Sequence, residues 1–259
     1  MLSLLRCVGV YAIFAVNIAL CFVTVLVLGV ITIPLDPQVR HSLCCGACQW
    51  INYVFIRMIF WVRLDFRGKI DGTNLVIVSN HVSSLDMFVI NAFLFERYRH
   101  YHRVHVVASA RVLTIPIFGF VMRALGVIPV KIVNDGDPKG LLAKNKYDPA
   151  NVTDVYEKCA QRLADGDTLF MFPEGKRNHT PLTLNRMNAG AFNVSHRSRR
   201  PIKILGIKGV DAIWPAKRHP IGAGTITIEA FDGEYLFDDI DTYRTTLTST
   251  LGPWLQSNR

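Results

Sequence analysis

The stretch LVIVSNHVSSLD, residues 75–86, joins a strand-like run to a helix-like one. Its apolar start predicts a short buried strand. A helical pattern follows, with Ser83 or Ser84 as the expected N-cap and Asp86 in the first turn. His81 then lies where the strand ends, and a carboxylate five residues on can fold back onto its imidazole, as a general base requires. The alternative is a loop histidine beside an aspartate that only favours a helix amino terminus.

A second polar loop, FPEGKRN at residues 172–178, follows another apolar run, TLFM at 168–171. This run also predicts a short strand. In α/β proteins, the loops at the carboxyl ends of neighbouring strands form binding sites at one edge of the sheet. We therefore expect the two polar loops to share one site.

Together the two loops resemble the signature motifs of the glycerolipid acyltransferase family, the lysophosphatidic acid acyltransferases. The first family motif, N-H-x-x-x-x-D, is matched by Asn80, His81 and Asp86. A later motif, F-P-E-G-T-R-S, is matched at Phe172, Pro173, Glu174, Gly175 and Arg177. Both motifs occur in the family order, and the resemblance covers residues 60–215.

The resemblance implies a reaction and two catalytic residues. A fatty acyl chain would move from an acyl thioester, either acyl-CoA or acyl carrier protein, to the free sn-2 hydroxyl of lysophosphatidic acid. His81 would be the general base and Asp86 the group that orients its imidazole, with no metal and no cofactor beyond the thioester co-substrate. In keeping with direct attack by the hydroxyl, the chain contains no Gly-x-Ser-x-Gly nucleophile elbow.

The resemblance also implies residues that bind the substrate. Arg177 is the expected phosphate ligand, since a guanidinium can grip two phosphate oxygens. Glu174 would hydrogen-bond the glycerol of the acceptor or brace its loop, and Gly175 would permit a tight turn. An intermediate family block, G-x-x-x-x-R, matches at 126–131 with Lys131 in place of arginine, and Arg111 is a second basic residue of that block.

Departures from the family pattern leave the acceptor open. Lys176 and Asn178 replace the usual threonine and serine of the second motif. The acceptor could instead be glycerol-3-phosphate, another lysophospholipid or a lyso-aminolipid. A further alternative is an inactive membrane-bound homologue that senses lipids, against which the intact pair of His81 and Asp86 argues.

Composition indicates phosphates and membranes as partners. The 259 residues carry a net charge of +9, half are hydrophobic, and the mean hydropathy is +0.25. We expect no nucleic-acid partner, because the chain has no zinc finger and no RNP-type aromatic motif. The six cysteines are too few for a disulfide framework in a chain of this length, and no second Cys pair completes a zinc site.

The amino-terminal region predicts membrane anchoring by one or two helices. Residues 7–33 carry no charge, and as a helix they would extend about 40 Å, enough to cross a hydrocarbon core of about 30 Å. A second apolar stretch, 43–62, contains Arg57 and would lie in the interface, form the second arm of a hairpin, or be an ordinary core helix. We therefore expect an anchoring domain at 1–62 and an acyltransferase domain at 63–259.

Basic residues outside the two apolar stretches predict the orientation. Arg6 precedes the first stretch, and Arg63, Arg67 and Lys69 follow the second. By the positive-inside rule, a hairpin with both ends in the cytoplasm fits best, which puts the active site on the cytoplasmic face of an inner or equivalent membrane.

Beyond residue 70, short apolar runs alternate with helical patterns. The predicted strands are 75–79, 104–108, 127–132, 168–172, 202–207 and 225–230, and the predicted helices are 84–98, 152–165, 186–195 and 239–256. Pro116 and Gly119 predict a broken helix at 111–125, and 134–151 reads as an exposed loop. This alternation predicts an α/β domain with a mostly parallel sheet and flanking helices.

Overall fold

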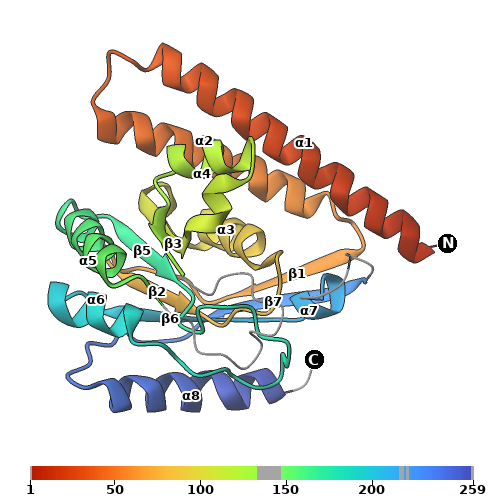
Figure 1. Cartoon of the computed structure of the whole chain (residues 1–259). Helices are drawn as coiled ribbons and strands as arrows, with labels where there is room; N and C mark the ends of the chain where they lie inside the picture. The colour runs from red at the N-terminus through yellow and green to blue at the C-terminus, as the bar shows by residue number, and fades with distance from the viewer. Residues whose placement is uncertain (1, 133–146, 216–218, 220–221, 258–259) are drawn as a thin grey trace.

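The central strand of the sheet is the apolar run before His81. The computed structural model of the chain describes residues 2–132, 147–215, 219 and 222–257. Its sheet has the strand order β1-β7-β6-β2-β5-β3-β4 (Figure 1). The strands are β1 (Val62–Arg67), β2 (Val76–Ser79), β3 (Val104–Ser109), β4 (Ile128–Val130), β5 (Thr168–Met171), β6 (Ile202–Lys208) and β7 (Gly224–Ala230).

Five parallel strands have their carboxyl ends at the same edge of the sheet. β2 pairs in parallel with both β5 and β6, and β3 pairs in parallel with β5 and β4. β7 is antiparallel to β6, and β1 is parallel to β7. The loops after β6, β2, β5, β3 and β4 therefore lie along the same edge. The prediction of a mostly parallel sheet is confirmed.

Helices cover both faces of the sheet (Figure 1). They are α1 (Leu2–Ile31), α2 (Pro37–Arg57), α3 (Asp86–Arg97), α4 (Phe118–Ala124), α5 (Pro149–Ala164), α6 (Gly190–Ser198), α7 (Val210–Ile213) and α8 (Ile240–Gln256). Alternate residues of β2 face opposite sides, so Ile77 packs with α3 while Val76 and Val78 pack with α5, α6 and α8. Two apolar layers result, one on each side of the sheet.

Helix α2 packs on α3 as a core helix does. Two of its buried polar side chains donate to backbone carbonyls: Asn52 donates to Phe88 at 2.6 Å and Gln49 to Tyr101 at 3.0 Å. The core-helix interpretation of the second apolar stretch expects such packing against the domain. The predicted domain boundary coincides with the start of β1, yet Val10 and Phe14 of α1 belong to the same apolar cluster as α3.

Helix α1 is long and presents apolar side chains to the outside. It is the one helix in the described part of the chain that is long and apolar enough to cross a membrane. Val16, Leu20 and Val23 are each at least 43% exposed on one stripe of it. The helix runs antiparallel to α2, so the two form a hairpin (Figure 1).

Several local predictions need correction. Neither Ser83 nor Ser84 caps α3; Leu85 occupies the N-cap, and Ser83 Oγ accepts a hydrogen bond from the amide of Leu85 and donates to the carbonyl of Trp214. Strand β1 was not predicted, because its alternating VRLDFR pattern directly follows an apolar stretch.

The connections between β3 and β5 were predicted only in part. The broken helix at 111–125 is confirmed as a 3₁₀ turn, η2 (Ala110–Thr114), followed by α4. In the expected loop at 134–151, α5 already begins at Pro149, where Asp148 accepts from the amide of Ala150. The rest of that expected loop, up to residue 146, lies outside the described residues.

Candidate active site

Asn80 fixes the point at which the chain leaves β2. Its side chain is fully buried, donates to the carbonyl of Ile207 at 2.8 Å and accepts from the amide of Ile207 at 2.9 Å. The amide side chain thus continues the pairing of β2 with β6 by one further step. The next residue, His81, starts from a rigid position at the carboxyl edge of the sheet.

His81 and Asp86 form the expected pair. Nδ1 of His81 lies 2.8 Å from Oδ2 of Asp86, which also accepts hydrogen bonds from the amides of Val82 and Ser83 at 2.6 and 2.9 Å. Asp86 is fully buried and is the first residue of α3, where the helix dipole favours a negative charge. Since a carboxylate only accepts, Nδ1 must carry the proton, which leaves Nε2 of the neutral ring able to accept one.

An aromatic ring holds the imidazole from its face. Phe172 stacks on His81 with ring centroids 4.0 Å apart and planes 12° apart. The side chain of His81 keeps 20% of its surface exposed. The ring is therefore fixed both by its edge, through Asp86, and by its face, while remaining open to a ligand.

Glu174 braces the loop that carries His81. Its carboxylate accepts from the amide of His81 at 2.9 Å and from the amide of Asn185 at 3.0 Å, and it is 2% exposed. Burial raises the pKa of Glu174, and the two amide hydrogen bonds oppose that rise. Of its two expected roles, bracing fits these contacts, because both oxygens are already engaged with the backbone.

The second loop closes on the first through its backbone. Gly175 has a φ of 66°, which a side chain would strain, and its amide donates to the carbonyl of Phe172 at 3.0 Å. The amide of Asn178 donates to the carbonyl of His81 at 2.6 Å. Its side-chain oxygen accepts from the amide of Thr180, so the asparagine that departs from the family pattern has a structural role.

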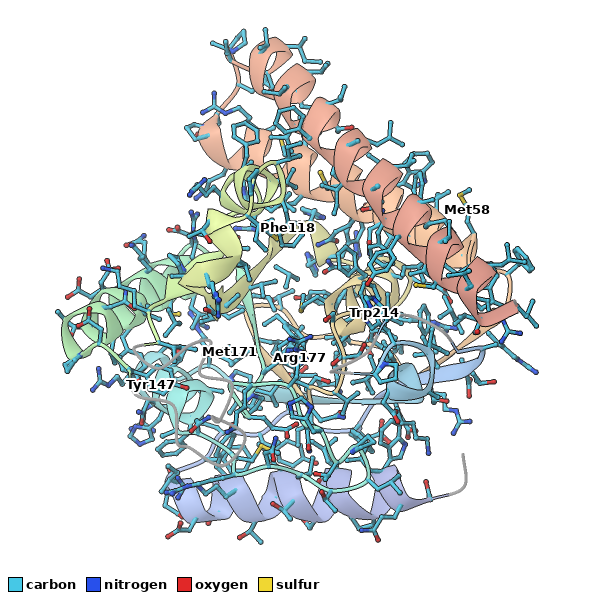
Figure 2. The ribbon with its side chains drawn as sticks, turned by 45° about the vertical axis from the view of Figure 1, so that its right-hand side comes forward. Met58, Phe118, Tyr147, Met171, Arg177 and Trp214 are labelled. Atoms are coloured by element: carbon cyan, nitrogen blue, oxygen red, sulfur yellow. The ribbon has the colours of Figure 1, made fainter. Side chains whose placement is uncertain are left out.

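Arg177 joins the two loops from the outside. Its Nη1 donates to Oγ of Ser84, in the turn between His81 and α3. The arginine side chain is exposed, and Figure 2 shows it near the middle of the molecule. A guanidinium in this position lies beside the proposed base and can meet an anionic group of a ligand there.

Arg111 and Lys131 lie on the same edge, but farther from His81. Arg111 follows β3 and Lys131 follows β4, which are two and three strands from β2. At about 4.8 Å between strands, these separations are about 10 and 14 Å. Arg177 is hydrogen-bonded to the His81 turn through Ser84, whereas the hydrogen bonds and ion pairs of the described residues join neither Arg111 nor Lys131 to that turn by a side chain.

Sequence reasoning missed the roles of Phe172 and Asn80, although both stand in the quoted motifs. The sequence places Phe172 at the end of a strand and Asn80 directly before the histidine, and these positions could have indicated a role. The partner of each residue, however, comes from another strand. No group of three His, Cys, Asp or Glu side chains in the described residues is arranged as metal ligands would be.

Comparison with known proteins decides the family. A profile of the family described as Acyltransferase matches residues 63–208, more than half of the chain. The chain belongs to the acyltransferase family. All seven predicted site residues fall inside the matched region, and the predicted resemblance is confirmed.

Two plant relatives and one solved structure resemble the chain. It is 27% identical over 143 residues to the 1-acyl-sn-glycerol-3-phosphate acyltransferase BAT2, chloroplastic, of Brassica napus, and 27% over 147 residues to LPAT1, chloroplastic, of Arabidopsis thaliana. These matches cover 55% of this chain but only 35% and 34% of the relatives, so the chain spans about a third of their length.

The crystal structure of the LPA acyltransferase PlsC from Thermotoga maritima has the same fold, with a TM-score of 0.75 over 98% of this chain and 95% of that one. At 15% sequence identity, this likeness concerns the fold alone.

Proposed function

We propose that the protein transfers a fatty acyl chain from an acyl thioester to the free sn-2 hydroxyl of lysophosphatidic acid, giving phosphatidic acid. Family membership supports the reaction type. The names of the two plant relatives support the acceptor. The observation that carries the proposal is the pair of His81 and Asp86 at 2.8 Å, with Nε2 of the imidazole left for a substrate.

The proposed reaction needs one proton acceptor and no enzyme nucleophile. Nε2 of His81 takes the proton of the acceptor hydroxyl as its oxygen attacks the thioester carbonyl. The buried carboxylate of Asp86 stabilises the imidazolium that forms. As the tetrahedral intermediate collapses, the C–S bond breaks, and the imidazolium returns its proton to the leaving thiolate. The products are the ester and the free thiol, and His81 is neutral again.

The phosphate of the acceptor would bind at Arg177. This guanidinium is exposed and tied through Ser84 to the turn that carries His81. Phosphate and base would thus be held on one rigid unit, which favours attack from a fixed geometry. Arg111 and Lys131 would add positive potential along the same edge of the sheet rather than a direct contact with the reacting group.

A membrane would supply the lipid acceptor. Ile115, Ile117 and Phe120 of the segment after β3 are exposed as well, and Phe120 packs on Phe22 of α1. That segment follows the same edge of the sheet as the His81 turn. We propose that this apolar surface enters the bilayer and brings the site to the lipid surface, on the cytoplasmic face if the charge distribution sets the orientation.

A product assay tests the proposal. Purified full-length protein in detergent-lipid micelles would be given lysophosphatidic acid, glycerol-3-phosphate or lysophosphatidylcholine, each with acyl-CoA or acyl carrier protein as donor. We expect phosphatidic acid from the first acceptor, acylated at sn-2, with one of the two donors. Turnover of another acceptor only would keep the chemistry and replace the substrate. No turnover with any pair would overturn the proposal.

A further inference from the structure

A cavity lies at the opposite edge of the sheet from His81. It has a volume of about 860 Å³, opens to the surface, and is lined by the end of α1, the first turns of α2, the 3₁₀ turn η1 (Tyr101–Arg103) and the end of α5. Figure 1 shows the α1–α2 connection at the upper left, on the side where α5 also lies. This volume is within the range of cavities that bind small ligands.

Strand β5 separates this cavity from the catalytic loops. Asp167, in the cavity wall, directly precedes β5, and Phe172, which stacks on His81, directly follows it. Five residues of extended chain span about 16 Å. The two sites therefore open at opposite ends of the same strand, and the cavity uses no residue of the His81 turn.

One wall of the cavity carries excess positive charge. Arg103 donates from Nε to Asp167 at 2.8 Å and from Nη2 to the carbonyl of Asp165 at 2.5 Å. Arg162 approaches Asp167 only to 3.9 Å, longer than a hydrogen bond. The carboxylate of Asp165, which accepts from Gln161, is not part of the lining. Two guanidinium groups thus face one lining carboxylate, and within the described residues Arg162 keeps donors for an anion.

The part of the lining that comes from α1 and α2 includes three apolar residues, Leu28, Val39 and Leu43, beside the polar Gln38 and Ser42. Ile31 and Ile33, in and just after the last turn of α1, follow Leu28 in the chain and are each 64% exposed. A ligand that fills both walls must therefore be anionic at one end and apolar at the other.

We propose that this cavity binds an anionic membrane phospholipid, with its phosphate at Arg162 and Arg103 and an acyl chain along Leu28, Val39 and Leu43. A free phosphate or a coenzyme phosphate could use the charged wall, but not the apolar one. The proposal rests on the proposed membrane association and not on acyl transfer. The bound lipid would hold the α1–α2 connection at the bilayer surface.

Binding in micelles tests the proposal without requiring a membrane or turnover. Full-length protein in a non-ionic detergent would be titrated with dioctanoyl phosphatidylglycerol by calorimetry. We expect saturable binding that Arg162→Gln weakens about tenfold or more, as the loss of a charge-assisted contact should. Leu43→Asp should weaken it as well. Lys158→Gln, which removes the same charge one turn earlier on the same helix and outside the cavity lining, should leave it unchanged.

Three results would overturn the proposal. If Arg177→Ala but not Arg162→Gln weakened binding, the lipid would occupy the catalytic loops instead. If inorganic phosphate bound as tightly and depended equally on Arg162, the cavity would be a simple anion site. Equal effects of Lys158→Gln and Arg162→Gln would indicate that lipid binding depends only on the net charge of the protein. Melting curves of each variant establish that it is folded, and the conservative Arg162→Lys should retain part of the affinity.

Discussion

Glu174 shows at the scale of one residue how the catalytic turn is held. Its two oxygens accept from the amides of His81 and Asn185, so a single buried carboxylate joins two loops from different strands. The motif sequence predicted that this residue matters, but it left open whether the carboxylate meets the substrate or the backbone. Nothing in the sequence names Asn185 as its partner, because that contact exists only after the sheet is assembled.

Replacement of Glu174 by Gln separates these two roles. Glutamine has one oxygen, and its amide group would face a backbone N–H, so one buried donor is left unpaired at a cost of about 1–3 kcal/mol. We expect a lower melting temperature and a kcat at least tenfold lower, with the KM for the acceptor nearly unchanged. A raised acceptor KM in a protein of unchanged melting temperature would assign Glu174 to the substrate instead.

Arg177 should act on binding more than on chemistry. Arg177→Ala should raise the acceptor KM with a small loss in kcat, because a contact made equally in ground and transition states affects binding alone. The loss of one charge-assisted contact, about 1.5–3 kcal/mol, corresponds to about one to two orders of magnitude in kcat/KM. Arg177→Lys should recover part of this loss.

The control for Arg177 is Arg97→Ala, which removes an equal charge from the far end of α3. It should leave both KM values unchanged. If Arg177→Ala raised only the donor KM, the residue would bind the phosphates of the coenzyme or carrier.

At the scale of elements, strands were predictable where an apolar run is flanked by polar loops, as at β2, β5 and β6. Sequence alone missed β1, because it directly follows an apolar stretch and none of its residues is fully buried at the sheet border. It also missed α7, which is too short to show a period. The site motifs were readable for a similar reason: they are local. Their supports, such as Asn80 against Ile207, join residues 127 positions apart and depend on strand order.

A histidine pair ties α2 to the sheet. His41 of α2 stacks on His105 of β3 with ring centroids 4.7 Å apart. His105 is fully buried, with its ring nitrogens 3.1 Å from the carbonyl of Gly126 and 3.0 Å from the carboxylate of Asp167. Burial lowers the pKa of His41 to about 4, and the nearby His105 and Arg162 act in the same direction. The backbone of Ala124 and the carboxylate of Asp167 raise it, but by less.

This pair predicts sensitivity to acid. The unfolded chain binds a proton at His41 near pH 6.5, while the folded protein resists it down to about pH 4, so stability falls as the pH drops through this window. After allowance for the partial exposure of the ring, the loss should be about 1–2 kcal/mol. Chemical unfolding between pH 7 and 4 should show a shallower decline for His41→Gln than for the wild type. Parallel declines would exclude His41 as the cause.

At the scale of the whole molecule, α1 has two faces with different tasks. Val10 and Phe14 enter the apolar cluster of the domain, whereas on the opposite stripe Val16, Leu20 and Val23 are 50%, 43% and 52% exposed. Helix α1 is therefore not a detachable anchor: its removal would expose part of the core. Sequence composition predicted its apolar character but not this division, because nearly every position is apolar and the pattern lacks a polar face.

The exposed stripe should hold the protein on membranes. Full-length protein should sediment with membranes and resist high salt and carbonate. Substitution of Val16, Leu20 and Val23 by Glu should release it while leaving the fold intact, since these side chains face outward. Three glutamates at Thr245, Thr248 and Ser249, exposed on α8, provide the control and should not release it. Retention of the α1 variant on membranes would place the contact elsewhere.

The central claim is that His81 is the general base, and the kcat/KM for acyl transfer by His81→Ala tests it most directly. His196→Ala is a matched control, because that imidazole also stacks on a phenylalanine, Phe192, at 5.5 Å. We predict a fall of about 10²–10⁴ for His81→Ala. We expect a smaller fall for Asp86→Asn, no fall for His196→Ala, and a melting temperature close to wild type in each. A folded His81→Ala variant that kept more than about a tenth of wild-type kcat/KM would contradict the account, because a loss below about tenfold is smaller than the contribution of a general base.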